Sequence, residues 1–219
     1  MKTLHILNGK EMHKTFVRRG FLKGETIAPF NEAMCDGAAH ETVFSQAFIQ
    51  QRAATHGVPV REYRKITIDP LSPLFHENYP RIALWFDEDM FCQINILTIL
   101  AWLDQTEYAG EVELTIVDDH MYPVDTIPFH VKGYHAVYKS VILNKKMTPD
   151  VKQLFLKRGI ELYLNHKKDL IKFIQQHPEH SDKEILDVLL SECKEYGLGD
   201  VQYRNLVKTA RGKESGEWY

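Results

Sequence analysis

Acidic side chains that follow apolar runs are the groups in this sequence whose types and spacing best suit chemistry. There are four of them: Glu32, Asp87, Asp89 and Asp118. If the fold brings their loops together, the carboxylate oxygens would bind Mg²⁺ and position a phosphate-bearing substrate. Alternatively, one carboxyl group with a raised pKa would transfer protons. We predict Glu32, Asp87 and Asp89 as catalytic residues.

A simpler interpretation is that Asp87 or Asp89 only caps the helix that follows it. An N-cap aspartate stabilises a helix by about 1 kcal/mol and needs no ligand to do so. The remaining acids would then be solvated turn residues. Both interpretations stay open at this stage, because different acids can have different roles.

Two further segments are expected to line a ligand site. The dipeptide Asn8-Gly9 ends a short apolar run and precedes a helical pattern, so backbone can approach a ligand and the helix N-terminus can attract an anion. A plain turn explains the same dipeptide. The loop 31–37, which includes Cys35 and Gly37, mixes carboxylates, an amide and a thiol. A helix-capping loop is the alternative there, because Asp-Gly is ordinary turn chemistry.

The apolar helix after Asp89 carries polar side chains that need an explanation. Gln93 and Asn95 lie among apolar residues, and buried amides require hydrogen-bond partners. A ligand or a neighbouring loop could supply these partners. Cys92 lies one turn into the helix, but its apolar neighbours favour an inert thiol. We include Gln93 with the ligand-binding candidates.

Several known site motifs are absent from the sequence. It contains no G-x-G-x-x-G and no G-x-x-x-x-G-K-[ST], so neither dinucleotide nor P-loop binding has motif support. Eleven histidines raise the question of zinc. However, no H-E-x-x-H occurs, and the grouping 118–120 lacks the spacing that places two ligands on one helix face, so zinc is not expected. The G-x-S-x-G motif of serine hydrolases is also absent, so that activity has no motif support.

Composition narrows the class of protein. A chain of 219 residues with 44% hydrophobic and 26% charged residues is long enough for a substantial core. A net charge of -3 and a pI near 6.4 give no general attraction to nucleic acid or to an anionic membrane. The apolar helix is too short and too polar for a membrane span. Three widely spaced cysteines and no visible signal peptide indicate a reduced, cytoplasmic protein.

The stretch 81–105 is the predicted centre of the fold. The run 82–86 is continuously apolar, which is typical of a strand covered on both faces, and about four turns of apolar helix follow the acids. Ligands of open α/β sheets bind beyond the carboxyl ends of the strands. The acidic turn 87–89 would lie at that place.

Strands alternate with helices through the first half of the chain. This order predicts a three-layer α/β domain with a mostly parallel, open, Rossmann-like sheet. The helix 41–56 ends in Gly and Pro signals, and Arg52 near its end is interpreted as a side chain that snorkels to solvent. The predicted strands are 3–7, 25–30, 82–86 and 111–117, and the helices between them are 10–19, 41–56 and the apolar helix up to residue 105.

Two segments interrupt this regular order. The proline-rich segment 58–80 reads as an irregular crossover with at most a short strand at 65–68. The segment 122–135 reads as a connector, and 134–143 would add a strand. From residue 146 the pattern turns helical, so we predict an α/β domain at 1–145 and a helical C-terminal subdomain at 146–219.

The C-terminal helices suggest a different class of function. The predicted helices are 151–165, 169–176, 182–196 (with a capping box from Ser181 to Glu184) and 201–209. The last two resemble a helix-turn-helix. The basic residues on or after the second of them are Arg204, Lys208, Arg211 and Lys213. The first is acidic and would repel phosphate, so packing or homodimerisation is favoured over DNA binding.

Four segments together resemble the bacterial "domain of unknown function 1835" family. They are LHILNG, NEAMCDG, the helix with QRA, and ALWFDEDMFCQINILTILAWL. The resemblance covers residues 3–120 and implies an α/β domain followed by helices, with no assigned activity. The first turn departs from the family pattern, since it reads Asn-Gly-Lys instead of Gly-Asp-Ser-like residues. The matching positions are Asn8, Gly9, Glu32, Cys35, Gly37, Asp87, Asp89 and Gln93.

The function expected from the sequence is therefore a small-molecule site, nucleotide- or phosphate-related, at the carboxyl ends of the strands of a cytoplasmic α/β protein. Whether the chain is an enzyme stays open at this stage. The alternative is a regulatory or interaction protein whose C-terminal helices bind DNA or a protein partner.

Overall fold

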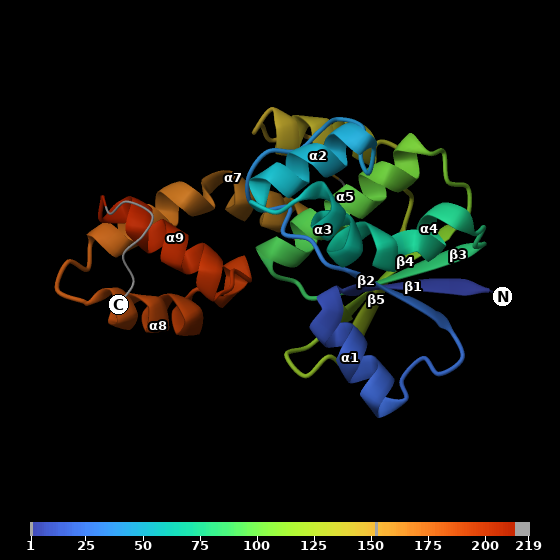
Figure 1. Ribbon diagram of the computed structural model, residues 1–219, viewed down its shortest axis with the longest axis horizontal. Coiled ribbons are helices and arrows are strands. Elements are labelled where there is room, and N and C mark those ends of the chain that lie inside the picture. The colour runs from blue at the N-terminus through green and yellow to red at the C-terminus, as the bar shows by residue number, and fades with distance from the viewer. Residues whose placement is uncertain (1, 152, 213–219) are drawn as a thin grey trace.

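The computed structural model describes residues 2–151 and 153–212 and has a five-stranded sheet at its centre (Figure 1). The strands lie in the order β2-β1-β3-β4-β5. β1 to β4 run parallel, and β5 runs antiparallel to β4 at the edge. Their bounds are β1 (Thr3–Asn8), β2 (Thr26–Phe30), β3 (Arg81–Phe86), β4 (Glu111–Val117) and β5 (Pro123–Phe129). The predicted fold class, a three-layer α/β fold with C-terminal helices, is confirmed.

The apolar run of β3 serves two hydrophobic cores. Leu84 and Phe86 point to the larger core, whereas Ala83 and Trp85 point to a smaller one on the opposite face. α1 (Gly9–Arg19) covers the smaller core. Successive strand residues face opposite sides of a sheet. A strand buried on both sides therefore shows no alternation, as the sequence of β3 indicated.

The remaining helices lie on the other face of the sheet or beyond it, as Figure 1 shows. α5 (Met90–Gln105) is the central one and is buried over most of its length. The others are α2 (Gln46–Thr55), α3 (Val60–Tyr63), α4 (Ser72–His76), α6 (Tyr134–Tyr138), α7 (Leu154–Gln175), α8 (Asp182–Glu192) and α9 (Asp200–Ala210). α2 begins later than the predicted helix, at the N-cap Ser45.

The proline-rich crossover differs from its prediction. No strand forms at 65–68, because Arg64–Ile68 is a π-helical turn that continues α3. Pro70 and Pro73 occupy the first turns of the two helical segments that follow. Proline is well tolerated at a helix start, where its missing N–H costs no hydrogen bond. The prolines therefore divide this segment into short helices.

The predicted connector 122–135 contains the strand β5. Its two prolines, Pro123 and Pro128, misled the sequence interpretation, since proline disfavours a central strand. β5 is an edge strand, where proline is acceptable because one side of its backbone has no ladder to complete.

The predicted strand 134–143 is wrong, because this segment is helical. α6 continues into the π-helical turn Lys139–Leu143. Its buried residues Tyr134, Val137 and Val141 recur every three or four positions, which is the helical period.

The C-terminal helices are also joined differently. The predicted helices 151–165 and 169–176 form one helix, α7, in which buried His166, Leu170 and Ile174 continue a single stripe. The capping box from Ser181 to Glu184 is present, but α8 ends at Glu192, before the predicted residue 196. Among the described residues, none of the helices combines the length and the apolar character that a membrane span requires.

One hydrophobic cluster joins the sheet to the C-terminal helices. It contains Leu84 of β3, Ile96 of α5, Ile160 of α7, Leu189 of α8 and Tyr203 of α9. The core therefore continues across the predicted boundary at 145/146. This continuity places the C-terminal helices against the first turn of α5, where several site residues were predicted.

Candidate functional site

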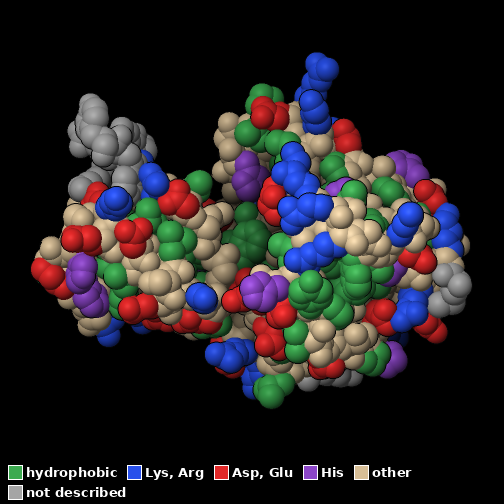
Figure 2. Space-filling view, turned by 90° about the horizontal axis from the view of Figure 1, so that it is seen from below, with side chains coloured by type: hydrophobic (Ala, Val, Ile, Leu, Met, Phe, Trp, Pro, Cys, Tyr) green, Lys and Arg blue, Asp and Glu red, His purple; other side chains and the backbone are tan. Residues whose placement is uncertain are grey.

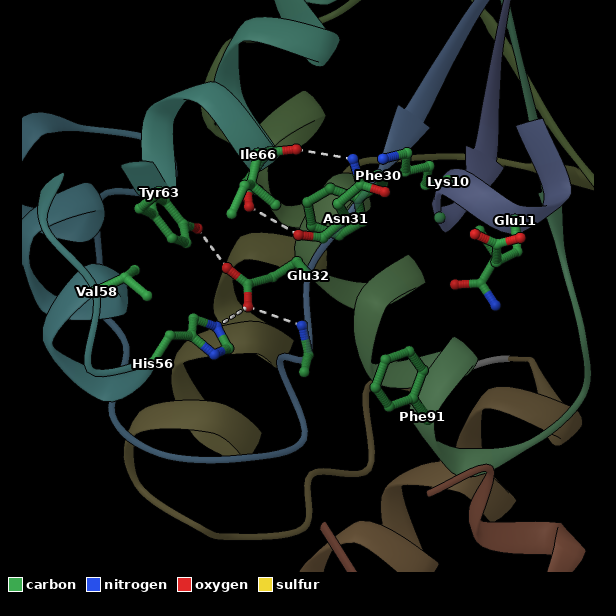
Figure 3. Close-up of a pocket in the computed structure, with 14 residues that line it drawn as sticks. Lys10, Glu11, Phe30, Asn31, Glu32, His56, Val58, Tyr63, Ile66 and Phe91 are labelled. Atoms are coloured by element: carbon green, nitrogen blue, oxygen red, sulfur yellow. Dashed lines mark hydrogen bonds and ion pairs between the residues drawn. The ribbon is translucent and has the colours of Figure 1, made fainter. Parts of the chain in front are cut away.

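A cavity of about 500 Å³, here called the inner pocket, opens at the carboxyl ends of the parallel strands (Figure 3). It is lined by Asn8, Gly9, Lys10, Glu11, Phe30, Asn31, Glu32, Ala33, His56, Val58, Tyr63, Ile66, Thr67 and Phe91. The chain leads from β1 to β2 on one side and from β3 to β4 on the other, so these two connections diverge at this end of the sheet, and residues 8–11 and Phe91 from them line the pocket. In open α/β sheets such a switch point is the usual place for a ligand.

The turn after β1 forms one wall of the inner pocket. Gly9 has a φ of +78°, a conformation that glycine adopts without steric cost. Asn8 is the N-cap of α1, but its side-chain amide donates to Sγ of Cys92 at 2.8 Å. Burial raises the pKa of the Cys92 thiol well above its ordinary value, which fits an inert core cysteine.

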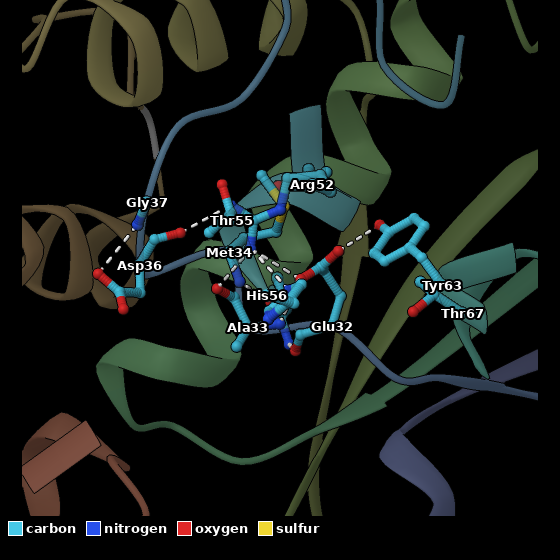
Figure 4. A network of polar contacts seen from close by, with 12 residues as sticks. Glu32, Ala33, Met34, Asp36, Gly37, Arg52, Thr55, His56, Tyr63 and Thr67 are labelled. Carbon is cyan, nitrogen blue, oxygen red and sulfur yellow. Dashed lines mark hydrogen bonds and ion pairs between the residues drawn. The ribbon is translucent and has the colours of Figure 1, made fainter. Parts of the chain in front are cut away.

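Glu32 lies in the inner pocket wall and is the centre of a buried polar network (Figure 4). Its Oε1 accepts from Nη2 of Arg52 at 2.8 Å and lies 2.7 Å from Nε2 of His56. The backbone N–H of Ala33 also donates to Oε1, and the Tyr63 hydroxyl donates to Oε2. The side chains of Glu32 and Arg52 are both fully buried.

The partners of Glu32 determine its charge. Burial alone would raise its pKa, but hydrogen bonds and charges from His56 and Arg52 outweigh burial and lower the pKa to about 2. Glu32 is therefore ionised at neutral pH and is a weak proton acceptor. A raised-pKa role in acid–base chemistry does not suit this carboxylate.

Arg52 also holds the loop that follows β2. Its guanidinium donates to the backbone oxygens of Asp36 at 2.6 Å, Ala38 at 3.0 Å and Ala33 at 2.9 Å. The interpretation of Arg52 as a side chain that snorkels was wrong. The available signal was its position one turn after Phe48, on the buried stripe of α2, where a cation needs an anionic partner.

His56 is the member of the network that solvent and ligand can reach. Its side chain is 33% exposed, and its ring stacks on Tyr63 with the centroids 6.0 Å apart. Glu32 binds Nε2, and no described residue hydrogen-bonds to Nδ1. Figure 3 shows His56, Glu32 and Tyr63 together, with Phe91 across the pocket. Sequence reasoning missed His56 and Tyr63, because nothing local marks them as neighbours of Glu32.

Asp89 caps α5, which agrees with the helix-capping interpretation of the acidic turn. Its Oδ1 accepts from the backbone N–H of Cys92 at 2.7 Å. Burial raises the pKa of Asp89 to about 6, and the charge of Asp87 adds to this effect. The C-terminal segment covers it, since a Cβ on Gly197 would lie 2.2 Å from Cγ of Asp89.

Asp87 and Asp118 lie on the other side of the sheet end from Glu32. Burial, followed by the charges of Asp119 and Asp118, raises the pKa of Asp87. Asp118 orders the turn before β5, because its Oδ1 accepts from the N–H groups of His120 and Tyr122, each at 2.9 Å. Within residues 2–151 and 153–212, no three His, Cys, Asp or Glu side chains are grouped to hold a metal ion.

The two amides of α5 are bound by protein groups. Asn95 donates to the backbone oxygen of Glu32 at 2.7 Å and accepts from the N–H of Met34 at 3.1 Å. A neighbouring loop therefore satisfies Asn95. Gln93 accepts from the N–H of Gly159 in α7 at 3.1 Å and donates to the backbone oxygen of Glu88.

Cys35 and Gly37 lie away from the inner pocket. Cys35 lines a separate cavity of about 190 Å³ between its own loop, α7 and α9. Burial raises the pKa of its thiol to about 12. Gly37 donates its N–H to Oδ1 of Asp36 at 2.9 Å, beside the loop that Arg52 holds.

The predicted site residues thus separate into four groups. Asn8, Gly9 and Glu32 meet in the inner pocket. Asp89 and Gln93 lie under the C-terminal helices, while Asp87 faces the turn after β4. Cys35 and Gly37 belong to the loop that joins β2 to α2.

No protein-family model matches this chain, and no curated protein matches it either. The functional argument therefore depends on the geometry of the site.

Proposed function

We propose that the inner pocket binds a small molecule that is a nucleotide or carries a phosphate. The observation that supports this most is the position of a cavity of about 500 Å³ at the switch point of the sheet. Small-molecule sites are concave and mostly apolar, with a few convergent polar groups. Phe30, Val58 and Phe91 supply apolar surface here, and Asn8 and His56 supply polar groups.

His56 is the group in this pocket that suits proton transfer. Nε2 of His56 lies 2.7 Å from Oε1 of Glu32 and 3.2 Å from Nη2 of Arg52, so Nδ1 is the ring nitrogen left for a ligand. A histidine oriented by a carboxylate is a common general base. Of the three carboxylates predicted as catalytic, Glu32 is the one that lines the pocket. We propose that it acts through His56, as a positioning residue.

A ligand screen with a blocking variant tests the proposed function. The full chain is mixed with nucleotides, nucleosides and sugar phosphates, and the melting temperature is followed. Val58→Trp places an indole in the inner pocket, so it should abolish the ligand-dependent rise in melting temperature. Val17→Trp is the matched control, because Val17 is 60% exposed and does not line the pocket. An equal ligand response in both variants would place the site elsewhere.

We further propose that the chain is a cytoplasmic relative of the bacterial "domain of unknown function 1835" family. Its three cysteines, Cys35, Cys92 and Cys193, are free and buried, which suits a reducing compartment. The residues that carry the resemblance include Asn8, Gly9 and Glu32, which meet in the inner pocket. A homodimer through the C-terminal helices stays a prediction that sedimentation analysis would test.

The alternative function, DNA binding by the C-terminal helices, gains no support from their ion pairs. Arg204 binds Asp200 with an N–O distance of 2.9 Å, and Arg211 binds Asp182 at 2.5 Å. Arg204 is thus paired within α9, and Arg211 is paired with the first residue of α8. Lys213, another of the basic residues named on or after the last predicted helix, lies outside the described residues.

A further inference from the structure

A second cavity of about 1010 Å³, here called the outer groove, adjoins the inner pocket. The two cavities share Lys10, Asn31 and Ile66 in their walls. The outer groove is completed by His13, Pro29, Pro59, Arg61, Glu62, Lys65 and Pro70. The two cavities are therefore neighbours, and the Asn31 amide in their shared wall donates to the backbone oxygen of Ile66 at 2.7 Å.

The walls of the outer groove carry an excess of positive charge. Lys10, Arg61 and Lys65 are exposed, and their side chains make no hydrogen bond or ion pair with another described residue. Glu62 is the one carboxylate in this wall. On the face that carries α1, Lys and Arg side chains gather beside a hollow with hydrophobic side chains at its base (Figure 2). These cations are available to an anionic ligand.

The inner pocket differs in its chemistry. The rings of Phe30, Tyr63 and Phe91 contribute to its wall, and they suit a flat heterocycle. The negative charge of Glu32 is balanced by Arg52 at 2.8 Å. Lys10, the cation of the inner pocket, lies in the wall shared with the outer groove, so the cations available to a phosphate gather on the groove side.

We propose that the ligand is a nucleotide that lies across both cavities, with its base in the inner pocket and its phosphate groups in the outer groove beside Lys10, Arg61 and Lys65. This inference rests on the proposed function and adds the class and the orientation of the ligand. A single nucleotide is favoured over a nucleic-acid strand, because the chain has a net charge of -3 and so no general attraction to a polyanion.

Isothermal titration calorimetry of the full chain at low and at high salt tests this inference. The probes are adenosine, guanosine, cytidine and uridine with their mono- and triphosphates, and a single-stranded oligonucleotide. The double variant Arg61→Gln/Lys65→Gln removes two cations of the groove. The double variant Arg18→Gln/Lys23→Gln is the matched control, since it removes the same charge from exposed residues outside both cavities.

The expected result is that a triphosphate binds more tightly than its nucleoside and loses affinity as salt rises. Loss of the two groove cations should weaken triphosphate binding about tenfold or more. Nucleoside binding should stay unchanged, and the control variant should bind both probes as the parent protein does.

Three results would overturn the inference in distinguishable ways. If triphosphate and nucleoside bind equally and the groove variant has no effect, the orientation is wrong while the proposed function survives. If the oligonucleotide binds more tightly than any mononucleotide, the ligand is a nucleic-acid strand and not a single nucleotide. If nothing in the set binds, a nucleotide ligand is excluded, and the proposed function then depends on the sugar phosphates of the wider screen.

Discussion

Glu32 and Arg52 form an ion pair whose side chains are fully removed from solvent. Removing water from two charges is expensive, and the pair is tolerated only where further hydrogen bonds complete it. His56 and Tyr63 contact the carboxylate, and backbone oxygens of the loop accept from Nη1 and Nη2 of the guanidinium, whereas its Nε is buried without a partner among the described residues. The pair therefore joins α2 to the loop that forms the wall of the inner pocket.

A double-mutant cycle measures this coupling. Arg52→Met removes the guanidinium from the buried Glu32 carboxylate, so the free energy of unfolding should fall by about 3–5 kcal/mol. Glu32→Gln combined with Arg52→Met should cost less than the sum of the two single changes, because neither charge is then left alone. Urea denaturation at neutral pH gives the four free energies. Additive costs would show that the two side chains are not coupled.

Asp89 should make stability depend on pH. Its pKa is raised from 3.8 to about 6, so its folded-state contribution is fully present below pH 4 and is lost as the pH rises through about 6. Asparagine is an equally good N-cap, so Asp89→Asn keeps the cap and removes the titration. The stability of Asp89→Asn relative to the parent protein should rise by about 1–2 kcal/mol between pH 4 and pH 7.

Thermal melts of the two proteins across this pH range test the prediction. Other titrating groups are present in both proteins, so their effects cancel in the difference. If the stability difference between the two proteins stays constant with pH, the pKa of Asp89 is not raised by burial.

At the scale of elements, the sequence correctly predicted the helices and strands whose own residues carry a clear local pattern. The apolar run of β3 and the apolar helix α5 were recognised because burial on both faces leaves a continuous signal. The edge strand β5 was missed because its burial comes from one neighbour and its prolines argue against a strand. The helical segment 134–143 was misread because its β-branched residues suit both structures.

The contact of the C-terminal segment with α5 requires glycine at position 197. Gly197 has a φ of +62°, and a Cβ there would lie 2.2 Å from the Asp89 carboxyl carbon. Gly197→Ala should therefore cost about 2–4 kcal/mol, from backbone strain and from displacement of the carboxylate. Gly20→Ala is the matched control, because Gly20 has a φ of +67° and nothing lies within 4 Å of its Cβ position.

The control should lose only about 1 kcal/mol, the cost of the backbone conformation. Denaturant midpoints of both variants give the comparison. Equal losses would mean that Gly197 is required for its conformation alone and that the contact with Asp89 is loose.

At the scale of the molecule, the C-terminal helices decide which predicted residues can share a site. They cover Asp89 and bind Gln93, while the inner pocket keeps Asn8, Gly9 and Glu32. Neither separation is visible in the sequence, because it depends on where α7 and α9 pack. The strand ends indicated the end of the sheet where the inner pocket opens, whereas the network of Arg52, His56 and Tyr63 comes from contacts distant along the chain.

The central claim is that the inner pocket and the outer groove together hold the ligand. A crystal structure of the full chain, grown with the nucleoside triphosphate that binds most tightly, tests this claim most directly. We predict electron density for the base beside Phe91 and His56, and for the phosphates within hydrogen-bond distance of Lys10, Arg61 or Lys65. Density for the nucleotide at Asp87 or in the cavity beside Cys35, with the inner pocket holding only water, would contradict the claim.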